Sequence, residues 1–151
     1  MSVKSQLKLE GVVTIRLIDK KSGKTVYEKR VKNAIMGGLA LAVCAGLAGD
    51  PNFPFPKITS VSLRDENDNV IKFLMEESMT VREWRSYSDH YDVHVVFKDT
   101  SSDAYTVVNV NLGGQGNTTS YSLARQTNLN VAKAADQVLV VDWVINVPFQ
   151  A

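Results

Sequence analysis

The chain has 151 residues, of which 44% are hydrophobic and 22% are charged, a composition typical of a globular protein and not of a disordered or fibrous one. This length predicts a single domain, residues 1–151, which buries roughly 70% of its unfolded surface without needing disulfides. Its 17 basic and 16 acidic residues give a net charge of +1, too little to attract phosphate backbones, so we expect no nucleic acid as partner.

The chain begins with a pattern that predicts a β-hairpin. Residues 1–9 are polar and mixed, which does not indicate a secretory signal, so we expect folding in a cytoplasm. Residues 9–18 alternate, with Val13, Ile15 and Leu17 on one face, as in a half-buried strand. Residues 19–24 form a polar turn containing Gly23, and residues 25–31 resume an extended pattern.

Residues 34–49 are small and apolar and include no charged residue, which predicts a helix that must be covered on every face. The helix is then either the centre of the core or a surface offered to another subunit. Asn33 is a preferred N-cap and Gly49 a preferred C′ residue. Sixteen helical residues span only about 24 Å, less than the roughly 30 Å of a membrane core, so we expect no membrane span.

The cysteine and the glycines of this predicted helix lead to two further expectations. Cys44, the only cysteine, is expected to be a small buried hydrophobe because no positive charge lies nearby to activate it. Gly37, Gly38 and Gly46 each weaken a helix by about 1 kcal/mol relative to alanine. Their presence predicts close approach of another backbone.

Pro51, Pro54 and Pro56 alternate with Phe53 and Phe55, a pattern that excludes a helix or a central strand. The segment is either a loop that tucks both phenylalanines into its own domain or an arm that anchors them in a partner. Phe53 and Phe55 are therefore candidate interface residues.

The rest of the chain alternates between strand patterns and polar turns. The last strand includes Trp143, which its alternation places on the core face. With the first hairpin the count is eight or nine strands and one helix, which predicts a mainly β (α+β) fold: an antiparallel sandwich or barrel with one buried apolar helix. The further expected strands are residues 58–64, 70–74, 81–87, 93–98, 105–112, 119–129 and 137–147.

No constellation of residues predicts catalysis, a metal site or a cofactor. His90 and His94 lie four residues apart in a strand pattern, about 13 Å from each other, too far for one ion. The acidic residues 65–69 lack the glycine of a calcium loop, and residues 113–116 lack the helix that a phosphate-binding loop needs. We therefore expect a protein that is not an enzyme.

Residues 81–87 combine aromatic and basic side chains. In a strand, Arg82 and Trp84 share one face while Arg85 and Tyr87 share the other. Tryptophan, tyrosine and arginine are enriched in protein interfaces, so Trp84, Arg85 and Tyr87 are candidate subunit contacts. The alternative is a carbohydrate-binding module that uses these three residues with Tyr91.

Four motifs occur in order along the chain: Val31-Lys32-Asn33-Ala34, Gly38-Leu39-Ala40-Leu41-Ala42 with Leu47-Ala48-Gly49, Ile58-Thr59-Ser60-Val61-Ser62-Leu63, and Val140-Val141-Asp142-Trp143-Val144-Ile145. In these motifs and in their order the chain resembles a family of small structural proteins from tailed-bacteriophage virions. It departs from the family at Arg64-Asp65, where the family has a glycine, and at Asn109-Val110-Asn111-Leu112, where the family has Glu-x-Gly-Leu.

This resemblance implies a subunit of the tail tip, the baseplate or the fibre attachment that assembles as a symmetric oligomer with other virion proteins. The chain would be made in the host cytoplasm and end up in the virion. A capsid decoration (cement) protein is the nearest alternative, because it too would be a small β-rich oligomer with a proline-containing arm.

Overall fold

The structure is a computed structural model that describes residues 9–35, 37–51, 57–115 and 120–149. These residues form eleven strands, one α-helix and one short 3-10 helix. The elements are β1 (Glu10–Asp19), β2 (Thr25–Ile35), α1 (Gly37–Leu47), β3 (Lys57–Arg64), β4 (Val70–Leu74), η1 (Glu76–Ser78), β5 (Met79–Ser86), β6 (His90–Asp99), β7 (Tyr105–Val107), β8 (Asn109–Gln115), β9 (Ser120–Gln126), β10 (Val131–Lys133) and β11 (Gln137–Pro148).

Nine strands form one antiparallel sheet in the order β4-β3-β8-β9-β2-β1-β11-β6-β5. Strand β2 is shared between two layers, because residues 25–33 pair with β1 while Ala34 and Ile35 pair with β9. We call β2-β1-β11-β6-β5 sheet A and β4-β3-β8-β9 sheet B. The edge strands β4 and β5 lie at opposite ends of the order, so the predicted sandwich is confirmed and a closed barrel is not formed.

The core lies between the two sheets, and the alternation of each strand decides which residues enter it. Sheet A places every second residue of β1, β6 and β11 inside, and sheet B does the same with β3 and β8. Trp143 is fully buried, as predicted. The buried core residues of the two sheets are Val13, Ile15, Leu17, Val95, Phe97, Leu139, Val141, Trp143 and Ile145 from sheet A, and Ile58, Val61, Leu63, Leu74, Val110, Leu112, Leu123 and Ala124 from sheet B.

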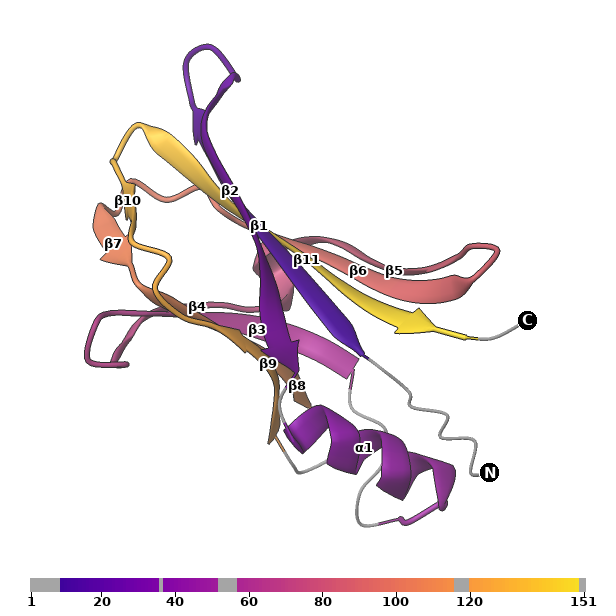
Figure 1. Ribbon diagram of the computed structural model, residues 1–151. Helices are drawn as coiled ribbons and strands as arrows, with labels where there is room; N and C mark the ends of the chain where they lie inside the picture. Colours follow the sequence, from indigo (N-terminus) through magenta and orange to yellow (C-terminus); the bar gives the residue numbers. More distant parts are fainter. Residues whose placement is uncertain (1–8, 36, 52–56, 116–119, 150–151) are drawn as a thin grey trace.

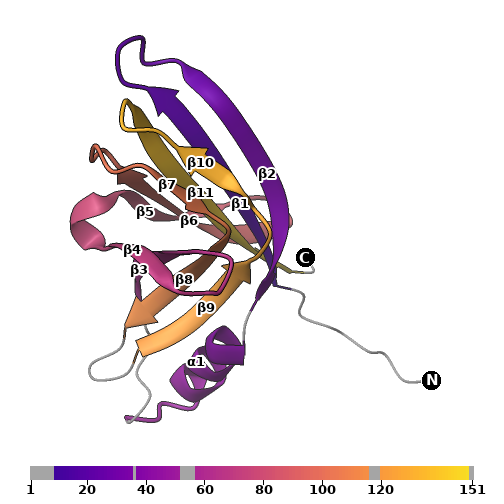
Figure 2. The same cartoon turned by 90° about the vertical axis from the view of Figure 1, so that its left-hand side faces the viewer.

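The two ends of the sandwich are occupied by different elements. Helix α1 lies beyond the sheets at one end, opposite the turn that joins β1 to β2 (Figure 1). The short pair β7-β10 lies toward the other end (Figure 2), where Val107, Leu129 and Val131 are buried. We call the α1 side the open end and the β7-β10 side the closed end.

Asn33 is not the N-cap of the helix, contrary to the sequence prediction. It belongs to β2, and α1 begins four residues later at Gly37. Its side-chain Oδ1 accepts a hydrogen bond of 3.0 Å from Nε1 of Trp143, which satisfies the indole N–H in the core. Gly11 leaves room for this amide, because a Cβ there would lie 2.2 Å from Oδ1 of Asn33.

The end of α1 follows the prediction. Gly49 has φ of +70°, the left-handed conformation that favours glycine. The N–H of Gly49 donates to the carbonyl of Gly46, and the N–H of Asp50 donates to that of Ala45, both at 3.0 Å. This pair of bonds is a Schellman motif, so the helix stops before Pro51.

Several details of the strands differ from the sequence prediction: eleven strands are present in the described residues instead of eight or nine, β9 ends at Gln126 instead of residue 129, and β10 was not predicted. The strand expected at residues 105–112 is divided into β7 and β8 at Val108, whose N–H donates to Arg64 and whose carbonyl accepts from Leu129. Gly113 and Gly114, expected in a loop, belong to β8. In the described part of the chain, no helix is long and apolar enough to cross a membrane.

Candidate functional site

Helix α1 is apolar along its whole length, yet the rest of the described chain leaves most of it uncovered. Only Ala42 is buried, while Leu41 is 48% and Leu47 is 79% exposed. Among the described residues, the prediction of a buried helix is therefore wrong. Leu41 and Leu47 thus leave apolar surface in water at the open end.

Gly38 is the point at which α1 meets sheet B. A Cβ added there would lie 2.4 Å from the backbone oxygen of Ser122 in β9, whereas one at Gly37 would meet nothing within 4 Å. The predicted close approach of another backbone is thus confirmed at Gly38. Cys44 is exposed, so the prediction that it is a buried hydrophobe is wrong.

An apolar hollow of about 480 Å³ lies at the open end, between α1 and the inner faces of the two sheets. Lys57, Arg82 and Glu83 bring charge to this lining. Arg82 donates to the carbonyl of Ile58 and to Glu76, both at 3.0 Å. The apolar lining residues are Leu9, Leu39, Ala42, Val43, Ile58, Trp84, Val93, Leu123, Ile145 and Val147.

Exposed aromatic side chains lie beside this hollow. Trp84 is 71% exposed, and its ring centroid lies 6.2 Å from that of Tyr91. Tyr91 in turn lies 5.2 Å from Phe149. These three rings lie where the inner face of sheet A is no longer covered by sheet B. The exposed apolar surface therefore continues from α1 onto β5 and β6.

Arg85 and Tyr87 lie on the opposite face of β5, as the alternation predicts. They line a polar hollow of about 640 Å³ on the outer face of sheet A, together with His90 and Asp92. The ring of Tyr87 stacks on His90 at 4.3 Å, and Arg85 lies 6.0 Å from the Tyr87 ring. The proposed sugar platform is therefore divided between two faces, with Trp84 and Tyr91 separated from Arg85 and Tyr87.

Ion pairs cross the outer face of sheet A from strand to strand. Arg85 binds the buried carboxylate of Asp92 through two nitrogens at 2.8 Å each. His94 lies between two carboxylates, with Nε2 2.8 Å from Asp142 and Nδ1 3.3 Å from Glu83. Arg85 with Asp92, and His94 with Asp142 and Glu83, thus link neighbouring strands on this face.

His90 and His94 share this outer face, as the strand pattern predicts, but each has its own acidic neighbour. His90 lies 2.6 Å from Asp89. Among the described residues, no three histidine, cysteine, aspartate or glutamate side chains are grouped to hold a metal ion. Phe53 and Phe55, the other predicted interface residues, lie outside the described residues.

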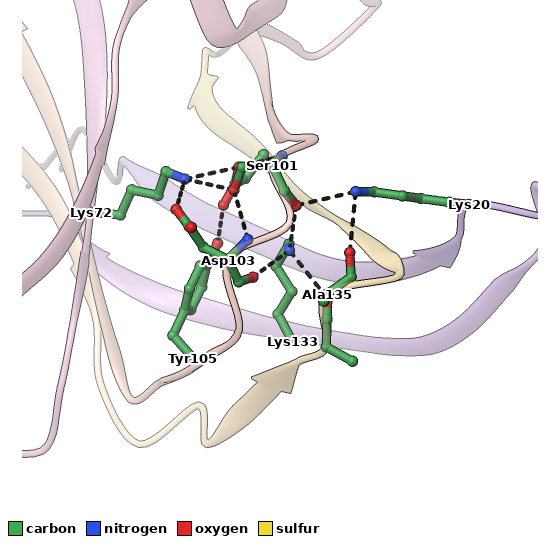
Figure 3. Close-up of polar contacts among 9 residues, drawn as sticks. Lys20, Lys72, Ser101, Asp103, Tyr105, Lys133 and Ala135 are labelled. Carbon is green, nitrogen blue, oxygen red and sulfur yellow. Dashed lines mark hydrogen bonds and ion pairs between the residues drawn. The ribbon is translucent and has the colours of Figure 1, made fainter.

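The closed end carries a polar cluster that the sequence patterns did not reveal (Figure 3). Lys133 is buried, and its Nζ donates to the carbonyls of Ser101, Asp103 and Ala134 at 2.9, 2.6 and 3.2 Å. Its three N–H groups therefore each have an acceptor. Lys133 holds the loop after β6 against the turn before β11.

Asp99 and Lys72 join the two sheets within the same cluster. Lys72 of β4 lies 3.2 Å from the carboxylate of Asp99 at the end of β6, and it also donates to Ser101 and Asp103 at 2.7 and 2.8 Å. Tyr105 donates its hydroxyl proton to Asp99 at 2.5 Å. Asp99 is thus surrounded by donors from three segments of the chain.

The electrostatics of this cluster follow from burial and from those donors. Burial alone would raise the pKa of Asp99, but hydrogen bonds from Tyr105, Ser101 and Lys72 outweigh it and lower the pKa to about 2. Burial, with Asp99 beside it, raises the pKa of Tyr105. Burial lowers the pKa of Lys133, although Asp99 opposes the change. The cluster therefore holds Asp99 as a carboxylate in fixed hydrogen bonds, an arrangement suited to joining segments.

The chain was compared with known protein families, with curated proteins and with solved structures. No family, no curated protein and no solved structure matches it.

Proposed function

We propose that the protein is a non-enzymatic structural subunit of a bacteriophage virion, in the tail tip, the baseplate or the fibre attachment, which assembles as a symmetric oligomer. The observation that carries this proposal is the uncovered apolar helix. Leu41 and Leu47 face solvent in a segment that has no charged residue, and burial of such a surface against another subunit is strongly favourable.

Three further observations support the proposal. The exposed rings of Trp84, Tyr91 and Phe149 enlarge the apolar surface at the same end. Ion pairs link neighbouring strands on the outer face of sheet A, as in Arg85–Asp92 and His94–Asp142. A separate ion pair, Lys72–Asp103, links segments at the closed end. Both arrangements suit a rigid scaffold. The order of the elements resembles small virion proteins.

The assembly part of the proposal is tested by light scattering on the purified full chain, coupled to size-exclusion chromatography. We expect the wild type to form a defined oligomer. The double variant Leu41→Ser with Leu47→Ser should have a smaller mass and an unchanged circular dichroism spectrum. The matched control is Val26→Ser, which removes an exposed apolar side chain from the β1–β2 hairpin and should leave the mass unchanged.

The virion part is tested by the genes that flank the coding sequence and by mass spectrometry of purified virions. Flanking tail genes and recovery of the chain in tail fractions support the proposal. Recovery in head fractions would point to a capsid decoration protein instead. A locus without virion genes, together with virions that lack the chain, would contradict both.

A second candidate function, carbohydrate binding, is favoured by a different surface from the one predicted. A hollow of about 560 Å³ on the outer face of sheet B is lined by Phe73, Met75, Asn111 and several hydroxyl-bearing residues. Phe73 is 56% exposed, and the buried Oδ1 of Asn111 accepts no hydrogen bond from the described residues. An exposed ring in a hollow lined by hydroxyl-bearing residues suits a neutral sugar, which offers an apolar face and hydroxyl groups.

A glycan array tests this second function. Binding by the wild type that is lost in Phe73→Ser and in Asn111→Ala, but kept in Trp84→Ser, would place the site on sheet B. An array with no signal for the wild type would contradict carbohydrate binding.

A further inference from the structure

We propose that two copies of the chain pair through their edge strands β5, antiparallel and centred on Trp84, so that sheet A continues from one subunit into the other. This inference rests on the proposed assembly role, and it names β5–β5 pairing as one interface of the proposed oligomer. Strand β5 is the last strand of the nine-stranded order, and no strand in the described part of the chain pairs with its outer edge. Such an edge is a template for a further strand.

The hydrogen-bond pattern of the β5-β6 pair shows which backbone groups of β5 are available. The N–H of Tyr87 donates to the carbonyl of His90 at 2.9 Å, and the register from there to Arg82 is unbroken. Hydrogen-bonded pairs alternate along an antiparallel ladder, so Arg85 and Glu83 face β6 with their backbone groups. Those of Arg82, Trp84 and Ser86 therefore face the free edge.

The side chains of β5 are complementary to a second copy of the same strand. A two-fold axis at Trp84 places Trp84 opposite the partner's Trp84, and Glu83 opposite the partner's Arg85. Aromatic pairs and pairs of opposite charge are both favourable across antiparallel strands. The two-fold axis also places Arg82 opposite the partner's Ser86, so all the edge-facing backbone groups find partners.

The charges select this register over its neighbours. A two-fold axis at Glu83 would place that carboxylate opposite its own copy, and an axis at Arg85 would do the same with two guanidinium groups. A two-fold axis that passes between two residues of β5 would pair residues whose backbone groups face the free edge with residues of the partner whose backbone groups face β6. Only the axis at Trp84 combines matching backbone groups with opposite charges.

The side chains concerned are accessible. Trp84 is 71% exposed, the side chain of Glu83 is 50% exposed and that of Arg85 is 35% exposed. Arg85 binds Asp92 through Nε and Nη2, so Nη1 is the nitrogen that would meet the partner's Glu83. The pairing thus leaves the two Arg85–Asp92 hydrogen bonds within each subunit in place.

The first test is Glu83→Lys, which turns both cross-strand ion pairs into repulsions, measured by light scattering of the full chain over a range of concentrations. We expect the dissociation constant of the dimer to rise at least tenfold at low salt, with partial recovery at high salt. The matched control, Glu77→Lys, makes the same change of charge in η1, outside β5 and outside the paired residues 82–86, and should associate like the wild type.

The second test removes a backbone donor. Ser86→Pro deletes an N–H that faces the free edge, which an edge strand tolerates in the monomer, while Ser86→Ala keeps that N–H. We expect dissociation in the proline variant alone, with a native circular dichroism spectrum in both. If the proline variant fails to fold, the outcome of Glu83→Lys decides.

The results separate this pairing from the wider assembly proposal. Wild-type association in both Glu83→Lys and Ser86→Pro would overturn the β5 pairing, and loss of mass in Leu41→Ser with Leu47→Ser would then still support assembly through α1. A wild-type chain that remains monomeric at all concentrations would also overturn the pairing. Failure of the chain to enter virions, with the β5 dimer intact, would instead contradict the virion role.

Discussion

The closed end and the open end of this sandwich complete the same core in opposite ways. At the closed end, Lys133 and Lys72 bind backbone and carboxylate oxygens of the loop after β6, so the polar groups are satisfied within the chain. At the open end, α1 and the ring of Trp84 leave apolar surface in water. The closed end therefore contributes to the stability of the subunit, whereas we propose that the open end contacts another molecule.

The largest expected effect comes from the core between the ends. Trp143 is fully buried and bonded to Asn33, so Trp143→Ala should lower the free energy of unfolding by about 3 to 5 kcal/mol. Urea denaturation of the two proteins measures the difference. A variant as stable as the wild type would show that Trp143 is not in the core and would reverse the assignment of inner and outer faces.

At the closed end, Asp99→Asn should lower the free energy of unfolding by about 2 kcal/mol at pH 7, since the pKa of Asp99 falls from 3.8 to about 2 in the folded chain. Because the pKa of Asp99 is lower in the folded chain than in the unfolded chain, the Asp99 carboxylate stabilises the fold fully above about pH 4. This stabilisation is lost as the pH falls through about 2. The wild type and Asp99→Asn should therefore converge in stability between pH 4 and 2. Parallel curves over that range would contradict a role for the Asp99 charge.

The strands of this fold could be predicted from the sequence, but neither end could. Alternation with a period of two is local, so it identified both the first hairpin and the inward face of Trp143. The closed end brings together Lys72, Asp99 and Lys133 from distant segments, and no local pattern relates them. Composition showed that α1 needs cover on every face, but not that the described residues leave much of it exposed.

Asn33 and Val108 show why some boundaries were misplaced. An asparagine before an apolar segment is a good N-cap by local propensity, yet the indole of Trp143 uses its side chain inside the core. Val108 continues an apolar strand pattern, yet its backbone bonds Arg64 and Leu129 and divides the strand. In both cases a tertiary hydrogen bond outweighs the local preference.

A smaller effect is expected where α1 rests on sheet B. Gly38→Ala should destabilise the chain by about 1 kcal/mol, because a clash with the Ser122 carbonyl, which costs about 1 to 3 kcal/mol, is partly offset by a gain in helix propensity of about 1 kcal/mol. Gly37→Ala is the matched control, since a Cβ there has open space. Thermal unfolding of both checks the prediction, and equal melting temperatures would contradict the close approach.

The smallest effect on stability is expected at the open end, for Trp84→Ala. This variant is the counterpart of Trp143→Ala, which has the largest expected effect. Trp84→Ala removes the same side chain as Trp143→Ala, but the Trp84 side chain is 71% exposed, so little apolar area returns to water on unfolding. The free energy of unfolding of the dilute monomer should change by less than about 0.5 kcal/mol. At high concentration the variant should associate less than the wild type, because the exposed ring belongs to the contact surface of the proposed assembly. Urea denaturation at low concentration and light scattering at high concentration measure the two quantities. A large loss of stability in the monomer would mean that the open end, like the closed end, holds the subunit itself together.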